Sequence, residues 1–151
     1  MARSPSVRAF LDTNVIFSGL LSDEGPPARL LDGLAEGKFV GVISSQVLDE
    51  LTRNVARKAP GNIAALEFLL SGTALEIVED PVAADVALWM PLLRLGDAVI
   101  IAAAITCHPE YFVTGDRHFL ESSAIAEKSA LAIVTPAQFL AELEIREQRA
   151  R

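Results

Sequence analysis

The sequence of 151 residues has a single cysteine, Cys107, and lacks long hydrophobic runs. One cysteine cannot form an internal disulfide, so we expect a fold without cross-links and a reducing, cytoplasmic location. The longest apolar run, Ala98–Ile105, is far shorter than the roughly 20 residues that a transmembrane helix needs. We therefore expect no association with a membrane.

Basic residues and glycine-rich nucleotide motifs are also scarce. There are 13 Lys and Arg against 20 Asp and Glu, giving a net charge of -7, which argues against a general electrostatic attraction to nucleic acid. A nucleic-acid enzyme whose acids bind metal ions is still possible, because the cations neutralise the site locally. The sequence contains neither a Walker loop nor Gly-x-Gly-x-x-Gly, so nucleotide-cofactor chemistry has no support.

What the chain does contain is an apolar composition in which strand-like and helix-like segments alternate. Hydrophobic residues make up 51% of the sequence, which is typical of a globular domain. Alternating strands and helices predict an α/β fold with a mainly parallel sheet. We expect one domain over residues 7–142, preceded by an N-terminal tail at 1–6 and followed by a charged C-terminal tail at 143–151. The predicted strands are 7–11, 39–43, 75–78, 111–113 and 130–134. The predicted helices are 14–21 (the start of a helix or a polar-edged turn), 26–36, 46–57, 64–70, 81–93 (interrupted by Pro91), 98–107 and 136–147.

Acidic side chains follow two of these predicted strands directly. Asp12 comes after strand 7–11, and Asp116 comes shortly after strand 111–113. Ligands of open parallel sheets bind at the carboxyl ends of the strands, and an acid next to a buried strand needs a partner. The sequence therefore predicts an acidic site at this edge of the sheet.

Two further acids belong to predicted helices. Glu50 flanks the apolar stripe of helix 46–57, so it can reach a site beside the core, although a solvated boundary position is the more frequent situation for such a residue. Asp97 precedes a helix that is apolar all round and is therefore buried. An alternative role for Asp97 is to cap that helix or support its first turn.

Carboxylates gathered at one edge repel each other, and burial raises their pKa values. A divalent cation removes this repulsion, and oxygen ligands suit Mg²⁺ or Mn²⁺. Such ions can activate water for displacement at a phosphodiester. His118 could be a ligand or a proton carrier, but a lone histidine in a loop is more often a surface or hydrogen-bonding residue.

Four short motifs in this order resemble the PIN domain family over about residues 7–140. They are Phe-Leu-Asp-Thr-Asn at 10–14, Ser-x-x-Val-Leu-x-Glu-Leu around Glu50, Asp-Ala-Val-Ile-Ile-Ala-Ala-Ala at 97–104 and Val-Thr-Gly-Asp at 113–116. The resemblance implies a three-layer α/β/α sandwich and a metal-dependent ribonuclease, with Mg²⁺ or Mn²⁺ as cofactor. It also implies an acidic metal-binding and catalytic quartet with two polar supporting residues: Asp12, Glu50, Asp97 and Asp116, supported by Asn14 and Thr114.

Many small single-domain PIN proteins look like the toxin half of bacterial toxin–antitoxin pairs, often as homodimers. The resemblance thus implies an RNA substrate, a homodimer and a separate antitoxin protein as partner. Two alternatives are a non-catalytic PIN-like module that binds RNA or protein, and a phosphatase of the haloacid-dehalogenase type. The phosphatase would require Asp-x-Asp after the first strand, where this sequence has Asp12-Thr13-Asn14.

Basic residues near Glu50 could hold the substrate of such an acidic protein. Arg53 and Arg57 lie three and seven positions after Glu50, on the same side of the predicted helix. Guanidinium groups pair well with phosphate, so we expect both to contact RNA. The alternative is a solvated helix face on which Asp49 pairs with Arg53.

Overall fold

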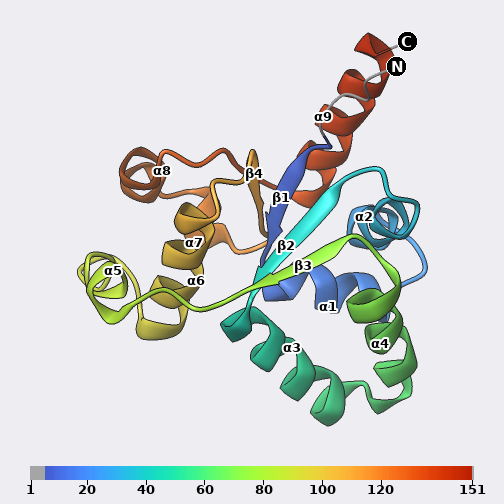
Figure 1. The fold of residues 1–151 in the computed structure, drawn as a ribbon, viewed down its shortest axis with the longest axis horizontal. Coiled ribbons are helices and arrows are strands. Elements are labelled where there is room, and N and C mark those ends of the chain that lie inside the picture. The colour runs from blue at the N-terminus through green and yellow to red at the C-terminus, as the bar shows by residue number, and fades with distance from the viewer. Residues whose placement is uncertain (1–5, 151) are drawn as a thin grey trace.

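A five-stranded parallel sheet forms the centre of the computed structural model, which describes residues 6–150 (Figure 1). Its order is β3-β2-β1-β4-β5, and every neighbouring pair is parallel. The strands are β1 (Arg8–Leu11), β2 (Val40–Ser44), β3 (Leu75–Val78), β4 (Tyr111–Val113) and β5 (Ile133–Val134). The predicted α/β class is confirmed, and the sheet is wholly parallel.

Helices cover both faces of this sheet and make the predicted three-layer sandwich. In Figure 1, α5 to α8 lie on one side of the strands and α1, α2 and α4 on the other, while α9 packs against α2. The longer helices are α1 (Thr13–Leu21), α2 (Pro26–Ala35), α3 (Ser45–Lys58), α4 (Ile63–Gly72), α6 (Leu95–Thr106) and α9 (Pro136–Arg149). The shorter ones are α5 (Ala83–Ala87), α7 (Arg117–Leu120), α8 (Ser123–Ser129) and the 3₁₀ helix η1 (Pro60–Asn62). None of the helices in residues 6–150 has the length and apolar character needed to cross a bilayer.

The central strands form because their side chains are buried on both faces of the sheet, as expected for parallel strands. Phe10 of β1 lies in register with Val42 of β2 and Phe112 of β4. The rings of Phe10 and Phe112 stack with centroids 5.6 Å apart, and both side chains are fully buried. This packing fixes β1 and β4 side by side, so the two segments that follow them emerge together.

Helix α3 has the predicted amphipathic face. Ser44 is its N-cap, and its hydroxyl accepts a hydrogen bond from Val47 N at 3.3 Å. Val47, Leu51 and Val55 are buried, whereas Asp49 is exposed. This orientation turns the Glu50 side of the helix toward the carboxyl edge of the sheet.

Three sequence predictions need correction. Helix 81–93 is wrong in extent: α5 spans only Ala83–Ala87, and the chain then continues in turns through Pro91, which cannot donate a backbone hydrogen bond to a helix. Helices α7 and α8 were not predicted, because they are too short to show helical periodicity. Strand 130–134 is reduced to β5.

The predicted domain limits are not tested by the fold. Helix α9 runs without interruption across residue 142, where the C-terminal tail was expected to begin, and ends at Arg149. Residues 1–5 of the predicted N-terminal tail and residue 151 lie outside the described part of the chain. The domain boundaries therefore stay predictions.

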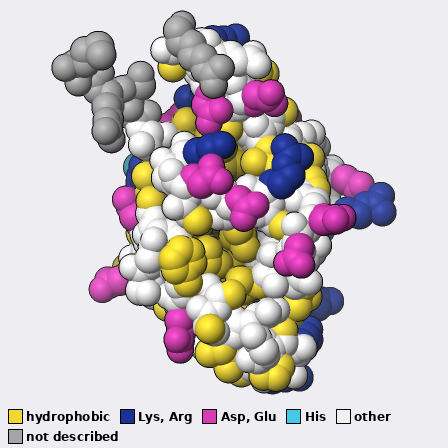
Figure 2. Space-filling view, turned by 90° about the vertical axis from the view of Figure 1, so that its right-hand side faces the viewer, with side chains coloured by type: hydrophobic (Ala, Val, Ile, Leu, Met, Phe, Trp, Pro, Cys, Tyr) yellow, Lys and Arg dark blue, Asp and Glu magenta, His cyan; other side chains and the backbone are white. Residues whose placement is uncertain are grey.

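Exposed apolar side chains occur mainly on two parts of the surface. Ile63 and Phe68 of α4 are 44% and 55% exposed. Figure 2 shows hydrophobic side chains gathered on the side of the molecule that lies to the right in Figure 1, below a band of mixed charges. The second group flanks α5 and continues through the turns to the first residue of α6: Val82, Leu88, Met90, Leu92 and Leu95.

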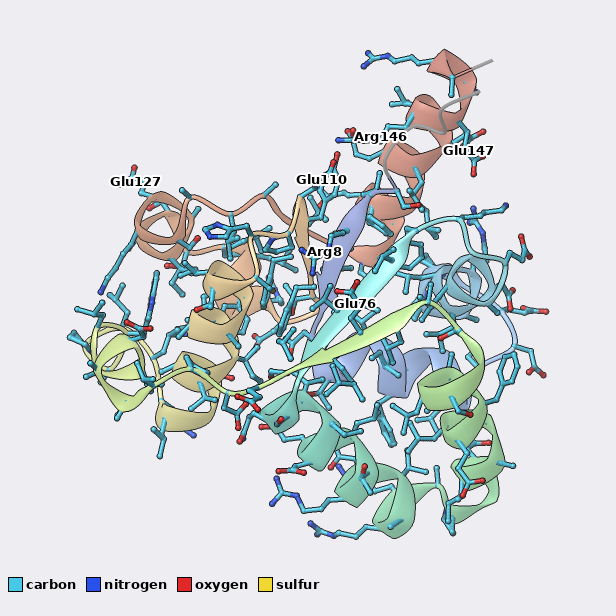
Figure 3. The ribbon with its side chains drawn as sticks, viewed as in Figure 1. Arg8, Glu76, Glu110, Glu127, Arg146 and Glu147 are labelled. Carbon is cyan, nitrogen blue, oxygen red and sulfur yellow. The ribbon has the colours of Figure 1, made fainter. Side chains whose placement is uncertain are left out.

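Ion pairs at the amino edge of the sheet use several of the basic residues (Figure 3). Arg8, at the start of β1, pairs with Glu76 of β3 at 2.8 Å and also donates to the Cys107 carbonyl at 2.9 Å. Arg146 of α9 pairs with Glu110, just before β4, at 2.9 Å. These contacts tie outer segments to the amino ends of the strands, opposite the edge where Asp12 and Asp116 lie.

The close approach of α1 and α2 makes Gly19 sensitive to substitution. A Cβ atom at Gly19 would lie 2.6 Å from Leu31 Cδ1 and 2.8 Å from the Pro27 carbonyl oxygen, which is inside van der Waals contact. Because overpacking of this kind typically destabilises by about 1–3 kcal/mol, Gly19→Ala should lower the free energy of unfolding by that amount in urea titrations. Gly33→Ala is the matched control. Its Cβ would meet Phe39 at 3.6 Å, so it should be neutral or stabilise by up to about 1 kcal/mol. Equal effects of the two variants would contradict the described packing of α1 on α2.

Candidate functional site

The carboxyl ends of β1 and β4 lie side by side at the centre of the site. The backbone N–H of Asp12 donates to the Val113 carbonyl at 3.0 Å, which extends the pairing of β1 with β4 by one step. Asp12 then caps α1, while Thr114 begins the loop after β4. Two segments separated by about a hundred positions in the sequence are therefore in direct contact, as the sequence predicted.

The Asp12 carboxylate is almost fully buried, with 5% of the residue exposed. Its Oδ1 accepts a hydrogen bond from Thr13 N at 2.8 Å. Its Oδ2 accepts from Thr114 Oγ1 at 2.8 Å and from Asn14 Nδ2 at 3.1 Å. Both residues predicted to support the quartet, Asn14 and Thr114, thus contact this carboxylate directly.

The same two side chains also fix the loop that carries Asp116. Thr114 Oγ1 accepts from Asp116 N at 3.0 Å, and Asn14 Oδ1 accepts from Gly115 N at 2.9 Å. Asp116 Oδ1 accepts from His118 N at 2.8 Å and so caps α7. A Cβ atom on Gly115 would lie only 3.3 Å from Asn14 Oδ1, so the loop passes closely over the first turn of α1.

Glu50 reaches the site from α3. Its Oε2 accepts a hydrogen bond from Thr13 Oγ1 at 2.9 Å, and its Oε1 accepts from Gln46 Nε2 at 3.0 Å. A Cβ atom on Gly96 would stand 3.7 Å from Glu50 Oε1, so Glu50 lies against the first turn of α6. The roles of Thr13, Gln46 and Gly96 were not predicted from the sequence. Their only signal was adjacency to the acidic motifs.

Asp97 lies inside the first turn of α6 and does not cap it, because Arg94 occupies the N-cap position. The capping alternative is therefore wrong, whereas the first-turn position is the one a helix dipole favours for an acid. The pKa of Asp97 is raised above its usual value. Partial burial is the largest cause, and the charges of Asp116 and Glu50 add to it, whereas His118 and Arg94 act in the opposite direction. Asp97 is thus within electrostatic reach of two of the other predicted acids.

The pKa of Asp12 is raised from 3.8 to about 6. The largest cause is burial, and the charges of Asp97 and Asp116 add to it; hydrogen bonds from Thr114 and Thr13 act in the opposite direction. Desolvation and like charges both favour the neutral acid. The four predicted acids therefore form one electrostatically coupled group at the carboxyl edge of the sheet.

The chemistry of this group suits a hard divalent cation, because every donor is an oxygen and added positive charge would relieve the repulsion. Its present arrangement is not a closed coordination shell. Within residues 6–150, no three Asp, Glu, His or Cys side chains converge closely enough to hold one ion. Both oxygens of Asp12 are already engaged in hydrogen bonds.

The two arginines predicted to bind RNA are exposed on α3. Arg53 makes no ion pair with Asp49, and neither Arg53 nor Arg57 has an ion-pair partner elsewhere in residues 6–150. The alternative of an Asp49–Arg53 pair is therefore wrong for the described structure. Contact with RNA stays a prediction.

Comparison with known families identifies the fold at this point. A family model described as PIN domain matches residues 8–118. The chain belongs to the PIN domain family. Members of this family are nucleases and typically use divalent metals, which favours a nuclease over the haloacid-dehalogenase alternative.

Solved structures with the same fold support this assignment. VapBC2 from Rickettsia felis bound to a DNA fragment from its promoter has a chain 22% identical to this one, with a TM-score of 0.62, covering 85% of this chain and 98% of that chain. PAE2754 from Pyrobaculum aerophilum is 18% identical, with a TM-score of 0.66, and the match covers 92% of this chain and 90% of that chain. FitAcB from Neisseria gonorrhoeae is 22% identical, with a TM-score of 0.57, and the match covers 85% of this chain and 97% of that chain. No curated protein matches the sequence.

The raised pKa of Asp12 predicts a pH-dependent stability. The folded protein binds the Asp12 proton more tightly than the unfolded chain does. Protonation of Asp12 therefore stabilises the folded protein fully below about pH 3.8, and this stabilisation is lost as the pH rises through about 6. Asp12→Asn has no such titration. In EDTA, the free energy of unfolding of Asp12→Asn relative to the parent should rise between pH 4 and pH 7, by on the order of 3 kcal/mol. Chemical denaturation at each pH measures this difference, and a pH-independent difference would contradict the described burial of Asp12.

Proposed function

We propose that this PIN-domain protein is a metal-dependent ribonuclease that hydrolyses RNA phosphodiester bonds. The observation that carries the proposal is the hydrogen-bonded arrangement of acids at the carboxyl edge of the sheet. Asn14 and Thr114 hold the buried Asp12 carboxylate and the Asp116 loop together, and Thr13 of the same turn donates to Glu50. Keeping such a group at the carboxyl edge of a sheet opposes stability in the metal-free chain, so a functional reason is expected. The presence of all four acids argues against a non-catalytic module.

In the proposed enzyme, Asp12, Glu50, Asp97 and Asp116 hold Mg²⁺ or Mn²⁺. When bound, the metal supplies charge for water activation and for the phosphate oxygens. The protein's own contribution is orientation. Asn14 and Thr114 direct the Asp12 carboxylate, and Thr13 and Gln46 direct Glu50. Such supporting hydrogen bonds set the direction of metal-binding oxygens.

We further propose that the protein is the toxin of a toxin–antitoxin pair, acting in the cytoplasm as a homodimer and held by a separate antitoxin protein. Chains similar to this one occur in VapBC2, which was solved bound to a DNA fragment from its promoter, and in FitAcB, and these neighbours support an antitoxin partner. The exposed apolar side chains of α4, Ile63 and Phe68, offer surface that a protein partner could cover.

A cleavage assay with matched variants tests the nuclease. Mixed-sequence RNA should be cut by the parent protein with Mn²⁺ and not in EDTA. Asp12→Asn should reduce the rate by at least about 100-fold, since even the loss of groups that only orient metal ligands costs about 10–100-fold. Asp49→Asn removes the same charge from an exposed position on α3 and should retain activity. A phosphate monoester serves as a second substrate, and turnover of it without RNA cleavage would favour a phosphatase.

Thermal melts across a Mn²⁺ titration provide a readout independent of activity. A ligand that binds only the folded state at about 100 times its Kd stabilises by about 2.7 kcal/mol, which is roughly 5–10 °C in Tm for a chain of this length. The parent and Asp49→Asn should show this shift, and Asp12→Asn a much smaller one. Equal shifts in all three proteins would place the metal elsewhere. RNA binding without metal-dependent cleavage or stabilisation would support the non-catalytic module.

Arg53 and Arg57 are proposed to bind RNA phosphates beside Glu50. Each phosphate contact on a single strand contributes about 0.7 to the slope of log affinity against log salt. Arg53→Ala/Arg57→Ala should therefore weaken RNA binding and reduce that slope by about 1.4. Arg29→Ala/Lys38→Ala removes two basic residues near α2 and α9 and is the charge-matched control. The same slope in the parent and the Arg53/Arg57 variant would show that these residues do not touch the substrate.

A further inference from the structure

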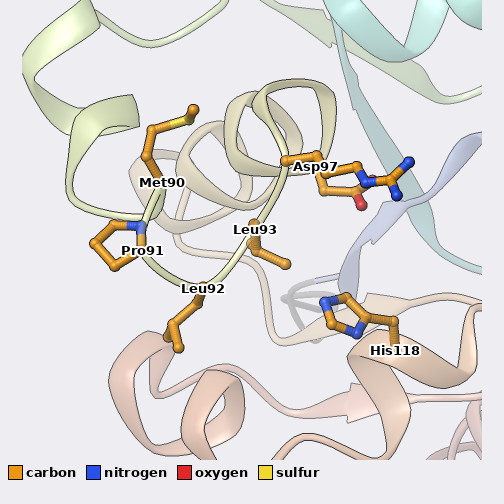
Figure 4. Close-up of a pocket in the computed structure, with 7 residues that line it drawn as sticks. Met90, Pro91, Leu92, Leu93, Asp97 and His118 are labelled. Atoms are coloured by element: carbon orange, nitrogen blue, oxygen red, sulfur yellow. The ribbon is translucent and has the colours of Figure 1, made fainter.

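A pocket of about 570 Å³ opens directly beside the acidic group (Figure 4). Three segments form it: the turns after α5, the start of α6 and the start of α7. Its lining residues are Met90, Pro91, Leu92, Leu93, Arg94, Asp97 and His118. Asp97 and His118 face the pocket from different elements in Figure 4, so its inner end is the proposed metal site and its outer wall is the turn.

The outer wall is apolar although it is open to solvent. Met90 is 46% exposed and Leu92 is 39% exposed, whereas Leu93 is buried at 5% and anchors the turn to the core. This exposed apolar surface next to an acidic group has no evident packing role within the described chain. It is suited to contact a flat or apolar part of a ligand.

Arg94 gives this wall a positive charge. Its backbone is fixed as the N-cap residue of α6, while its side chain is exposed. Within residues 6–150, the guanidinium makes no ion pair, unlike those of Arg8, Arg117 and Arg146. It is nonetheless close enough to Asp97 for its charge to act on that carboxyl. The Arg94 guanidinium can therefore bind an anionic group of a ligand next to the Asp97 carboxylate.

We propose that this pocket binds one nucleotide unit of single-stranded RNA next to the bond that is cleaved, with Arg94 on its phosphate and Met90 and Leu92 against its base. The inference rests on the proposed ribonuclease function and adds a substrate-binding residue and a strand preference to it. A guanidinium matches two phosphate oxygens at once. A base face is available to apolar side chains only when the base is unstacked, as in single strands and loops.

The position of Arg94 also accounts for how an acidic enzyme receives a polyanion. The carboxylates repel phosphate, and the net charge of -7 gives no long-range attraction. Arg94 on one flank of the acids and Arg53 on the other would offset this repulsion locally. RNA would then lie across the carboxyl edge of the sheet, over Asp97 and Glu50.

Steady-state cleavage of a fluorescein-labelled single-stranded RNA with Mn²⁺ tests the role of Arg94. Arg94→Ala should raise KM by about tenfold or more, the usual effect of losing a charged hydrogen bond, with a smaller change in kcat. Arg94→Lys keeps the charge and should have a KM between those of the parent and Arg94→Ala, because an ammonium cannot pair with two oxygens at once. Arg29→Ala, a surface arginine of α2, is the control and should match the parent.

Binding of the same RNA, measured by anisotropy with Ca²⁺ replacing Mn²⁺, separates charge from apolar contact. Arg94→Ala should reduce the salt slope by about 0.7. Met90→Ala/Leu92→Ala should weaken binding at an unchanged slope, because it removes apolar surface and no charge. A duplex of the same sequence should bind weakly to the parent and be insensitive to Met90→Ala/Leu92→Ala. Thermal melts verify that each variant is folded.

The outcomes distinguish the inference from the function on which it rests. If the parent cleaves RNA and Arg94→Ala has the KM and salt slope of the parent, the pocket inference alone is overturned. Equal binding of single strands and duplex overturns the strand preference. If the parent neither cleaves nor binds RNA, the proposed function fails and the inference fails with it.

Discussion

Three hydrogen bonds hold the buried carboxylate of Asp12 between the end of β1, the first turn of α1 and the end of β4. The carboxylate is desolvated, so these bonds are needed to keep it in place. They also determine where its neighbours lie. Thr114 and Asn14 bind Asp12 and the Asp116 loop together, and Thr13 connects the same turn to Glu50. The hydrogen bonds around Asp12 therefore determine how the carboxyl edge of the sheet is arranged.

The charges of the protein are distributed unevenly between the two edges of the sheet. At the amino edge, basic residues are matched to acids, as in the pairs Arg8–Glu76 and Arg146–Glu110. At the carboxyl edge, acids lie near other acids. Burial raises the pKa of Asp12 and Asp97, and the charges of the neighbouring acids raise it further. Such an arrangement is unfavourable in the empty protein and becomes favourable when positive charge arrives. This distribution agrees with the proposed metal ion, and with the proposed use of nearby arginines to bind an anionic substrate.

Most of the fold could be predicted from the sequence where the local signal is strong. The apolar runs of β1 and β4 and the 3.6-residue stripe of α3 each leave little choice of structure. Prediction failed where the structure depends on context. Helices α7 and α8 are set by the caps Asp116 and Ser122, and the apolar residues 88–93 form turns that pack Trp89 and Leu93. Apolar composition alone could not distinguish these turns from a helix.

The sequence by itself identified four candidate acids: Asp12 and Asp116 from their places after predicted strands, and the full set, with Glu50 and Asp97, from the resemblance of four local motifs to the PIN domain family. Only the tertiary structure decided which side chains meet. The Thr13–Glu50 and Thr114–Asp12 hydrogen bonds join residues 37 and 102 positions apart. The pocket brings His118 of α7 to Asp97 at the start of α6, where Arg94 is the N-cap of the same helix. Periodicity fixes the face of an element on which a residue lies, whereas the order of strands and the packing of helices fix which faces meet.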